Sequence, residues 1–380
     1  MAKNKTAGRH GLTFTADAAE LQKVLSRVQA GIVRKAQIPI LLNVLIEADP
    51  DLGVSFYTTN LDQQAETGLG ADVADVTAGG ATTVDAAMLH NLVGKMKGEV
   101  TLSMTGEHRL GIFCGKAKAE LPTLPATDFV KLGSIDDAVS FEIAGGMLAS
   151  GLNSVSHAVS SEETRYYLNG VLMEHRGGQL LFTATDGHRL AHIAVTASGH
   201  ELAPFEPVIV PRWALAPLVK LAGLGTDPVV LSIGQSMMQL TAGRDAFRVK
   251  LVDGTFPDYG RVIPKPPFKF TQTVPVAEAR EAVNLAIAAT TEKSNAVKLT
   301  GADGKLTAHV QQDGKWVEAF MEHPDIVDAA PIGVNGKYLV AALDRVSSSE
   351  ISLNYSDGQS PMLLQREGDA LVQVIMPLRV

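Results

Sequence analysis

The feature that most restricts how this sequence can fold is a helical pattern that occurs three times. Apolar residues spaced at i, i+3, i+4 and i+7 form amphipathic patterns that begin at Leu89, Leu215 and Leu339, which are 126 and 124 residues apart. A helix-start residue stands before each of these patterns, namely Asp85, Pro211 and Asn335. Repeats of this length are too large for a solenoid of helix pairs, so we expect three consecutive domains of similar fold.

A second helical pattern and short β-rich segments complete each repeat. The upstream helical patterns begin at Leu21, Leu148 and Val276. The β-rich segments are residues 54–58, 100–104, 179–185, 229–233, 305–310 and 350–353. We predict a loose tail at residues 1–10 and three domains over residues 11–132, 138–262 and 268–380, with joints near 132–138 and in the proline-rich segment 263–267.

The expected fold class is α+β, with antiparallel sheets and helices on separate sides. Each helix has one apolar stripe, so the stripe packs against a sheet and the polar face stays in water. The helices of three consecutive domains then share one side, and the domains form an arc. A head-to-tail contact with a second copy closes such an arc into a ring when the rotations sum correctly.

The composition favours a multidomain protein of a reducing compartment, so we expect a cytoplasmic location. The chain has 380 residues, which is too long for one ordinary core, and 46% of them are hydrophobic. A single cysteine, Cys114, excludes an intramolecular disulfide and a zinc site built on paired thiolates. The longest apolar stretch, residues 38–46, contains Pro39 and Asn43, so we expect no membrane span. Residues 1–10 are basic but lack the apolar core of a signal peptide.

Basic side chains gather on the expected helices, although the chain is acidic overall with 33 Lys and Arg against 41 Asp and Glu. Any one of these residues is more often an ordinary surface residue. Together, on helices that line one concave surface, they would hold a phosphate backbone without reading bases, which permits sliding. The residues are Lys23, Arg27, Arg34, Lys35, Lys95, Lys97, Arg165, Arg212, Lys220, Arg280, Lys293, Lys337 and Arg345.

The motifs of common enzyme classes are missing from the sequence. Gly304-Lys305 and Gly336-Lys337 lack the remainder of a Walker A motif, and no H-E-x-x-H, G-x-S-x-G or paired-carboxylate metal cluster occurs. One alternative is a hydrolase that uses His188 with Asp186. Their segment lies between two strand-like runs, however, and Asp-Gly favours a hairpin turn there. We therefore expect no catalytic residue, no metal and no cofactor.

Four motifs together give a resemblance to a known family. They are RYYLNG at residues 165–170, TDGHRLA at 185–191, KLVDG at 250–254 leading into FPDY at 256–259, and VIMPLRV at 374–380. In this order they closely resemble the bacterial sliding clamp family, the β subunits of DNA polymerase III. The resemblance covers about residues 11–380.

The resemblance implies a DNA clamp fold with three domains per subunit, closed as a head-to-tail homodimer around double-stranded DNA without sequence specificity. It implies helices on the inside of the ring and sheets on the outside. Such a protein tethers the polymerase III catalytic subunit and confers processivity in DNA replication without bond chemistry of its own. A separate ATP-dependent clamp loader opens the ring, consistent with the missing P-loop.

The family also implies a peptide-binding pocket at the junction of the second and third domains. It receives short linear motifs from the polymerase, the clamp loader and repair proteins. Apolar members supply a cleft and polar members orient an extended peptide, although core packing is a rival role for each apolar member. The matching positions are Leu168, Thr185, Gly187, His188, Arg189, Leu190, Pro257, Arg261, Val262, Val374, Met376, Pro377, Leu378 and Arg379.

Several positions depart from the family pattern. Gly260 stands where relatives often carry a second basic residue, and residues 359–361 replace small and apolar residues near the pocket, so the peptide preference stays open. Glu162 and Glu163 repel phosphate in a loop that approaches DNA in relatives. The candidate DNA contacts are Lys23, Arg27, Lys35, Arg165 and Tyr166. A second alternative is a peptide-binding scaffold that never encircles DNA.

Overall fold

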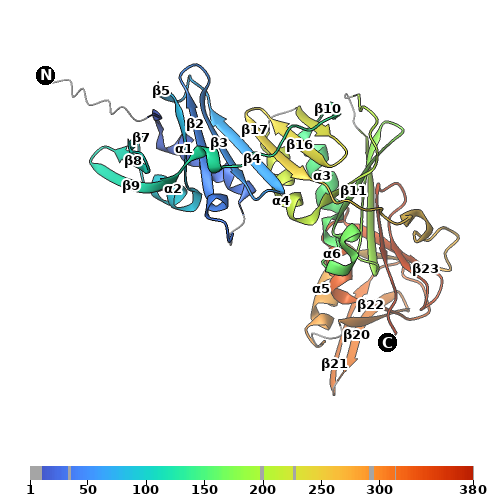
Figure 1. Ribbon diagram of the computed structural model, residues 1–380. Coiled ribbons are helices and arrows are strands. Elements are labelled where there is room, and N and C mark those ends of the chain that lie inside the picture. The colour runs from blue at the N-terminus through green and yellow to red at the C-terminus, as the bar shows by residue number, and fades with distance from the viewer. Residues whose placement is uncertain are drawn as a thin grey trace. The chain divides into compact units, whose positions relative to one another are not determined.

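The chain forms two compact units in a computed structural model that describes residues 11–32, 36–196, 201–225, 228–290, 295–312 and 314–379 (Figure 1). Unit 1 consists of residues 1–146 with 216–251, and unit 2 consists of residues 147–215 with 252–380. The predicted tail at residues 1–10 and the candidate DNA contact Lys35 lie outside the described residues.

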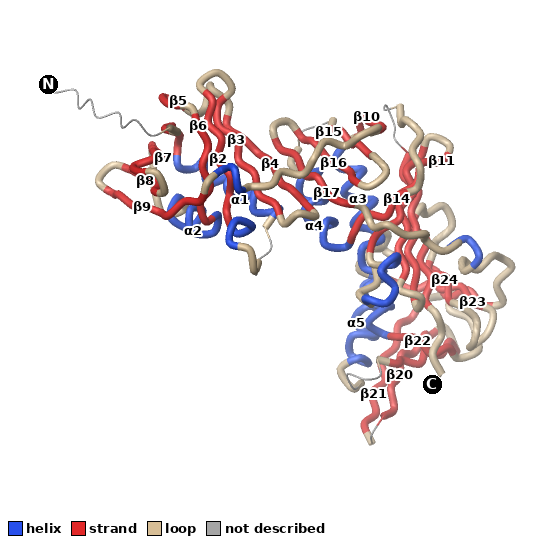
Figure 2. The backbone as a smooth tube through the Cα atoms, viewed as in Figure 1, coloured by secondary structure: helices blue, strands red, loops and turns tan. Residues whose placement is uncertain are grey.

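Unit 1 is built on a thirteen-stranded antiparallel sheet with the order β10-β15-β16-β17-β4-β3-β2-β6-β9-β8-β7-β1-β5. Helix α1 (Ala18–Val28) contacts β3, β4 and helix α2 (Ala86–Val93), and both helices lie on one side of the strands (Figure 2). The strands are β1 (Thr13–Asp17), β2 (Asn43–Asp49), β3 (Gly53–Thr59), β4 (Gln63–Leu69), β5 (Asp75–Ala78), β6 (Gly80–Asp85), β7 (Glu99–Gly106), β8 (Arg109–Cys114), β9 (Ala117–Leu124), β10 (Val139–Ile143), β15 (Val229–Ile233), β16 (Met237–Ala242) and β17 (Asp245–Lys250).

Unit 2 contains an eight-stranded sheet, β14-β11-β12-β13-β25-β24-β23-β18, and a four-stranded sheet, β21-β20-β19-β22. Helices α5 (Val276–Ile287) and α6 (Gly336–Leu343) pack against each other. Helices α3 (Gly145–Val155) and α4 (Arg212–Ala222) each begin in one unit and end in the other. The strands are β11 (Gly170–Arg176), β12 (Gln179–Thr185), β13 (Arg189–Thr196), β14 (Val208–Pro211), β18 (Phe270–Pro275), β19 (Ala296–Ala302), β20 (Lys305–Gln312), β21 (Lys315–Glu322), β22 (Ile332–Asn335), β23 (Glu350–Tyr355), β24 (Met362–Leu364) and β25 (Leu371–Ile375).

The strand topology repeats three times, which confirms the threefold repeat expected from the helical patterns. The orders β4-β3-β2-β6, β13-β12-β11-β14 and β21-β20-β19-β22 are equivalent. The orders β1-β7-β8-β9, β10-β15-β16-β17 and β18-β23-β24-β25 are equivalent as well. Strand β5 is an addition to the first repeat. Each repeat therefore contributes two sets of four antiparallel strands.

Two junctions join consecutive repeats through their sheets. In unit 1 the last strand of the second repeat, β17, pairs with β4 of the first repeat. In unit 2 the last strand of the third repeat, β25, pairs in the same way with β13 of the second repeat. The second repeat thus supplies strands to both units, which explains why there are two compact units and three repeats. The exact domain boundaries stay a prediction.

The helical patterns become buried stripes as expected. In α1 the pattern residues Leu21, Val24, Leu25 and Val28 are all buried, as are Leu148, Leu152 and Val155 of α3. The caps also follow the sequence, because Asp85 accepts a hydrogen bond from the N–H group of Met88 (2.7 Å) and Asn335 accepts one from that of Lys337 (3.0 Å). Pro211 differs from the prediction: it ends β14 opposite Gly170, so α4 begins one residue later, at Arg212.

Candidate functional site

The loop between β12 and β13 carries several predicted peptide contacts, and Asp186 holds it in shape. Its Oδ1 atom accepts hydrogen bonds from the N–H groups of His188 (2.9 Å) and Arg189 (3.0 Å). Its Oδ2 atom accepts one from Nε of Arg189 (3.0 Å). Gly187 has a φ of +87°, which favours glycine. The predicted hairpin is confirmed, and the Asp186 carboxylate is used by the backbone of the loop.

Arg189 is fixed by two partners at once. Its guanidinium group lies 4.2 Å from the centre of the Tyr338 ring and pairs with Asp186. Burial raises the pKa of Tyr338, and the neighbouring Asp186 raises it further. The side chain of Arg189 is only 17% exposed, so it serves as a rigid part of the wall and not as a free surface charge.

The C-terminal segment of the chain is joined to this loop by strand pairing and backbone hydrogen bonds. In β25, Val374 lies opposite Leu190 of β13. Beyond the strand, the N–H group of Met376 donates to the carbonyl oxygen of His188 (2.9 Å), and that of Leu378 donates to the carbonyl oxygen of Gly333 (2.8 Å). The structure therefore brings the TDGHRLA and VIMPLRV motifs together.

An apolar cluster, here named the Leu190 cluster, lies where the two motifs meet. Its buried members are Leu190, Leu363 and Val374, and the partly buried side chains packed against it are Tyr259, Ile263, Phe268 and Val372. The segment between the second and third repeats thus covers one face of the eight-stranded sheet.

Tyr259 anchors that segment to the sheet. Its hydroxyl donates a hydrogen bond to Glu174 (2.8 Å), and its ring centre lies 5.1 Å from that of His192. Burial, together with the Glu174 carboxylate, raises the pKa of Tyr259 to about 12. The phenol therefore stays neutral and keeps its donor role across the physiological range.

The predicted peptide residues fall into a buried, a half-buried and an exposed group. Leu168, Leu190 and Val374 are each less than 5% exposed, so they form a floor or core. Among the described residues, Leu168 does not belong to the Leu190 cluster. The accessible members are Gly187, His188, Pro257, Arg261, Val262, Leu378 and Arg379, while Thr185, Arg189, Met376 and Pro377 are half-buried.

Two cavities flank these residues within unit 2. One of about 770 Å³ is lined by Pro377, Leu378 and Arg379 together with Lys298 and Asp357. The other, of about 450 Å³, is lined by residues 254–260, Glu174 and Arg176 and by further residues of β11 and β14. Arg261 lies on the surface: its side chain is 85% exposed and pairs with Asp258 (2.8 Å).

A buried polar group lies close enough to Arg189 to be affected by its charge. The imidazole of His157 has its pKa lowered to about 3 by burial first and then by Arg189 and Arg345. Arg345 donates to Oδ1 of Asn153 (3.0 Å), and Gln373 of β25 donates to the carbonyl oxygen of Ala342 (3.0 Å). These contacts tie α3 to the end of α6 and to β25 within unit 2.

The candidate DNA contacts of α1 differ in how free they are. Lys23 is exposed, and its one ion-pair partner among the described residues is Glu20 on the same helix (2.7 Å). Arg27 pairs with Asp245 of β17 (2.9 Å), and Asp245 also accepts a hydrogen bond from Thr67. Arg27 therefore has a structural partner that the sequence pattern does not reveal.

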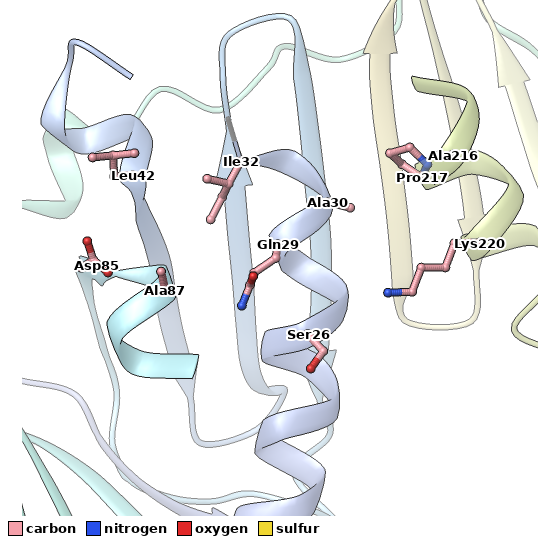
Figure 3. A pocket seen from close by; sticks show the side chains of 10 residues that line it. All are labelled: Ser26, Gln29, Ala30, Ile32, Leu42, Asp85, Ala87, Ala216, Pro217 and Lys220. Atoms are coloured by element: carbon pink, nitrogen blue, oxygen red, sulfur yellow. The ribbon is translucent and has the colours of Figure 1, made fainter. Parts of the chain in front are cut away.

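A hollow of about 690 Å³ lies between the helices of unit 1 (Figure 3). Ser26 and Gln29 at the end of α1 face it, and Lys220 of α4 lies across from them (Figure 3). Lys220 is exposed and has no ion-pair partner among the described residues. It is thus a freer cation than Arg27.

In unit 2, the candidate DNA contacts Arg165 and Tyr166 lie in the 3-10 segment Glu163–Leu168. Tyr166 is 55% exposed. Nε of Arg165 lies 3.5 Å from the Glu162 carboxylate, so the acidic residue that departs from the family pattern partly neutralises this cation.

The described part of the chain shows neither a metal-binding cluster nor a membrane-spanning helix. No group of three or more His, Cys, Asp or Glu side chains is placed to hold a metal ion within those residues. No helix among them is long and apolar enough to cross a membrane.

Sequence reasoning missed Tyr338, Tyr259 with Glu174, and Asp245. Tyr338 follows the correctly predicted cap Asn335, but nothing in the helical pattern marks an aromatic ring as the partner of Arg189. Asp245 lies 218 positions from Arg27, and no local pattern connects them.

Comparison with known proteins decides the family. Family models of the N-terminal, central and C-terminal domains of the DNA polymerase III β subunit match residues 12–133, 142–258 and 260–379. The chain belongs to the DNA polymerase III β subunit family. It has the three-domain α+β clamp fold, and as a β clamp it is a non-catalytic processivity factor of DNA replication, not an enzyme.

Individual relatives agree over nearly the whole chain. The β sliding clamp of Caulobacter vibrioides is 34% identical over 381 residues, which covers 97% of this chain and 100% of the relative. That of Escherichia coli is 29% identical over 379 residues, with the same coverage. The crystal structure of the Bacillus subtilis clamp has a TM-score of 0.91 at 25% identity, covering 97% of this chain and 100% of that one. A Caulobacter crescentus clamp structure has a TM-score of 0.89 at 32% identity, covering 98% and 100%.

Proposed function

We propose that two copies of this clamp close head to tail into a ring that encircles duplex DNA and slides along it. The observation that carries this proposal is the pair of internal junctions, β17 with β4 and β25 with β13. Each joins the last strand of one repeat, β17 or β25, to the edge strand of the preceding repeat, β4 or β13, and these two edge strands are equivalent to each other. A chain of three repeats makes two such junctions and leaves one half-junction open at each end.

Both open edges are present in the structure. Strand β21, the counterpart of β4 and β13, is an edge strand whose neighbour in its sheet is β20. Strand β9, the counterpart of β17 and β25, pairs with β8 along its length and with β6 only at Thr123 and Leu124. A junction between β9 of one copy and β21 of another uses both edges, and two such junctions close the assembly.

The helices supply cations to the proposed hole. Lys23 and Lys220 are exposed on α1 and α4, while the chain as a whole has a formal net charge of -8. A ring resists dissociation topologically, so a few weak phosphate contacts are enough to guide sliding. Arg165, Tyr166 and Lys35 remain proposed DNA contacts with the same role.

For the protein partners, we infer that short linear motifs of the polymerase III catalytic subunit, the clamp loader and other proteins dock beside the Leu190 cluster. The support is the junction of the TDGHRLA loop with the chain end at the buried Leu190 cluster. Exposed Val262 directly precedes Ile263 of that cluster, and exposed Leu378 follows Val374 shortly along the chain. Clamp structures from Pseudomonas aeruginosa and Bartonella birtlesii are described as bound to griselimycin, and the Caulobacter crescentus one as having PEG bound to a putative β-motif tethering region. Those descriptions agree with a ligand-binding surface on clamps of this family.

A cytoplasmic location and the domains 11–132, 138–262 and 268–380 complete the proposal. The location follows from a role at replicating bacterial DNA. The joint at 132–138 lies close to the gap between the first two family matches, whereas the joint at 262–268 lies just inside the third match, which begins at residue 260.

The test uses DNA topology. The protein is loaded onto a nicked circular plasmid with its clamp loader and ATP, separated from free protein, and the plasmid is then cut once. A ring is retained on the circle and leaves the linear product, more slowly when both ends are blocked by bound protein. A peptide-binding scaffold gives the same retention on circular and linear DNA, and that result would refute the ring.

A further inference from the structure

We propose that the β9 and β21 edges pair in one defined register, with Lys118 of one copy opposite Glu318 of the second copy. This inference rests on the proposed ring and adds to it the residues that align the edges. It identifies a second copy of this chain as the occupant of both edges. The register follows from the internal junctions and not from any observed dimer.

The two internal junctions have the same register relative to the repeat. In unit 1, Gln64 of β4 lies opposite Arg248 of β17. In unit 2, Leu190 of β13 lies opposite Val374 of β25. Each residue of the second pair is 126 positions beyond its counterpart in the first pair. The junction geometry is therefore a property of the repeat itself.

The registers of the β3–β4, β12–β13 and β20–β21 hairpins show which residues of β21 correspond to those of β4 and β13. Thr59 pairs with Gln64, Thr185 pairs with Leu190, and Gln311 pairs with Trp316 in the three corresponding hairpins. These pairs are again 126 positions apart at each step. Trp316 is thus the counterpart of Gln64 and Leu190.

The same comparison places β9. The β16–β17 hairpin closes with Ala242 opposite Asp245, and the β8–β9 hairpin closes with Cys114 opposite Ala117. Both have a two-residue turn, so Ala117 corresponds to Asp245 and Glu120 corresponds to Arg248. The third junction then pairs Glu120 with Trp316. Because the strands run antiparallel, Ala119 lies opposite Val317, Lys118 opposite Glu318, and Ala117 opposite Ala319.

The side-chain pattern of the two edges fits this register. Val317 and Ala319 pack partly against the core of unit 2, and Ala119 is half-buried on β9, so these small apolar side chains face one another. Lys118 and Glu318 are exposed on the opposite face, and neither has an ion-pair partner among the described residues. An opposite-charge pair directly across two antiparallel strands is stabilising.

Other registers place the charges worse. A shift by one residue turns the apolar set of one strand toward the charged set of the other. A shift by two residues in one direction sets Glu120 against Glu318, and in the other direction sets Glu318 against Lys116, which lies in the turn outside β9. The register copied from the internal junctions is thus also the one that pairs Lys118 with Glu318 inside both strands.

Disulfide trapping tests the register directly in the full chain. In a Cys114→Ser background, Lys118→Cys combined with Glu318→Cys should give a covalent dimer on oxidation, because directly opposed residues are within disulfide reach. The matched control combines Glu120→Cys with Glu318→Cys, which report the two-residue shift and are diagonal neighbours in the proposed register. Efficient trapping of the control pair without the 118–318 pair would overturn the inference.

Charge exchange tests the ion pair. Lys118→Glu should raise the dimer dissociation constant roughly tenfold, since two junctions each lose a cross-strand charge pair and gain a repulsion. Glu318→Lys should act alike, and the double exchange should restore affinity, which a folding defect would not do. Lys95→Glu, which makes the same change in net charge in the turn after α2, is the control and should leave dimerisation unchanged. Absence of restoration in the double variant contradicts the pairing.

Failure of the ring and failure of the register are distinguishable. If the unmodified chain is monomeric at micromolar concentration by mass measurement, the proposed function itself fails. If it is dimeric but only the control cysteine pair is trapped, the ring stands and the register is wrong.

Discussion

Arg27→Ala is expected to destabilise unit 1 in addition to any effect on DNA. The Asp245 side chain is 10% exposed and that of Arg27 is 40% exposed, so this pair lies between a surface ion pair and a buried one. Removing Arg27 leaves Asp245 with the Thr67 hydroxyl as its remaining side-chain partner. A lost hydrogen bond to a partly buried charge costs about 2 kcal/mol. Lys23→Ala removes only an exposed pair on one helix, which costs less than about 0.5 kcal/mol.

The measurement is thermal unfolding followed by calorimetry and far-ultraviolet circular dichroism. Tryptophan fluorescence is unsuitable, because both tryptophans, Trp213 and Trp316, belong to unit 2. A loss of about 2 kcal/mol lowers the melting temperature of a unit of this size by roughly 4–8 °C. Asp245→Asn should lower it similarly while keeping the Arg27 charge available to DNA, so it separates stability from DNA retention. If Arg27→Ala melts within about 1 °C of the unchanged chain, or no lower than Lys23→Ala, the reasoning is refuted.

Three further outcomes are expected. The first concerns His157, whose pKa is lowered to about 3 in the folded protein, whereas in the unfolded chain it binds a proton below about pH 6.5. The free energy of unfolding should therefore fall as the pH drops from about 6.5 toward 3, by at most about 1.4 kcal/mol per pH unit. His157→Gln should flatten that slope in urea titrations carried out at a series of pH values. Deleting residues 378–380 should weaken a clamp-binding peptide without dissociating the dimer, and unchanged affinity by calorimetry would remove Leu378 and Arg379 from the site. Gly187→Ala should lower the free energy of unfolding by about 1–2 kcal/mol and weaken binding of the same peptide, because the residue has a φ of +87° and a Cβ would lie 2.9 Å from Nη1 of Arg165. Full peptide affinity at unchanged stability would show that the loop tolerates the change.

Much of the fold could be predicted because its signals are local and periodic. The stripe that begins at Leu21 is buried as a stripe, and β12 and β15 have the bounds given by their β-rich segments. Asp85 and Asn335 act as caps because the residues that follow them start helices. Threefold repetition raised the value of each signal, since a pattern seen three times is seldom accidental.

The contacts that complete the site could not be predicted in this way. Motif resemblance located Arg189 and Leu190, but it could not show that Leu190 is buried or that Arg189 stacks on Tyr338. Such facts depend on which strands meet across long sequence distances, as β13 meets β25. The pairing of Arg27 with Asp245 arises in the same way, from a junction between two repeats.

The open edges of β9 and β21 give each chain two binding sites for another copy of the same chain. In a ring with two junctions, breaking one leaves its edges tethered by the other, so they meet again at an effective concentration far above that of free chains. Such a ring recloses faster than it falls apart. An opening factor therefore needs to weaken and hold apart only one of the two seams, and release of that factor is sufficient for closure.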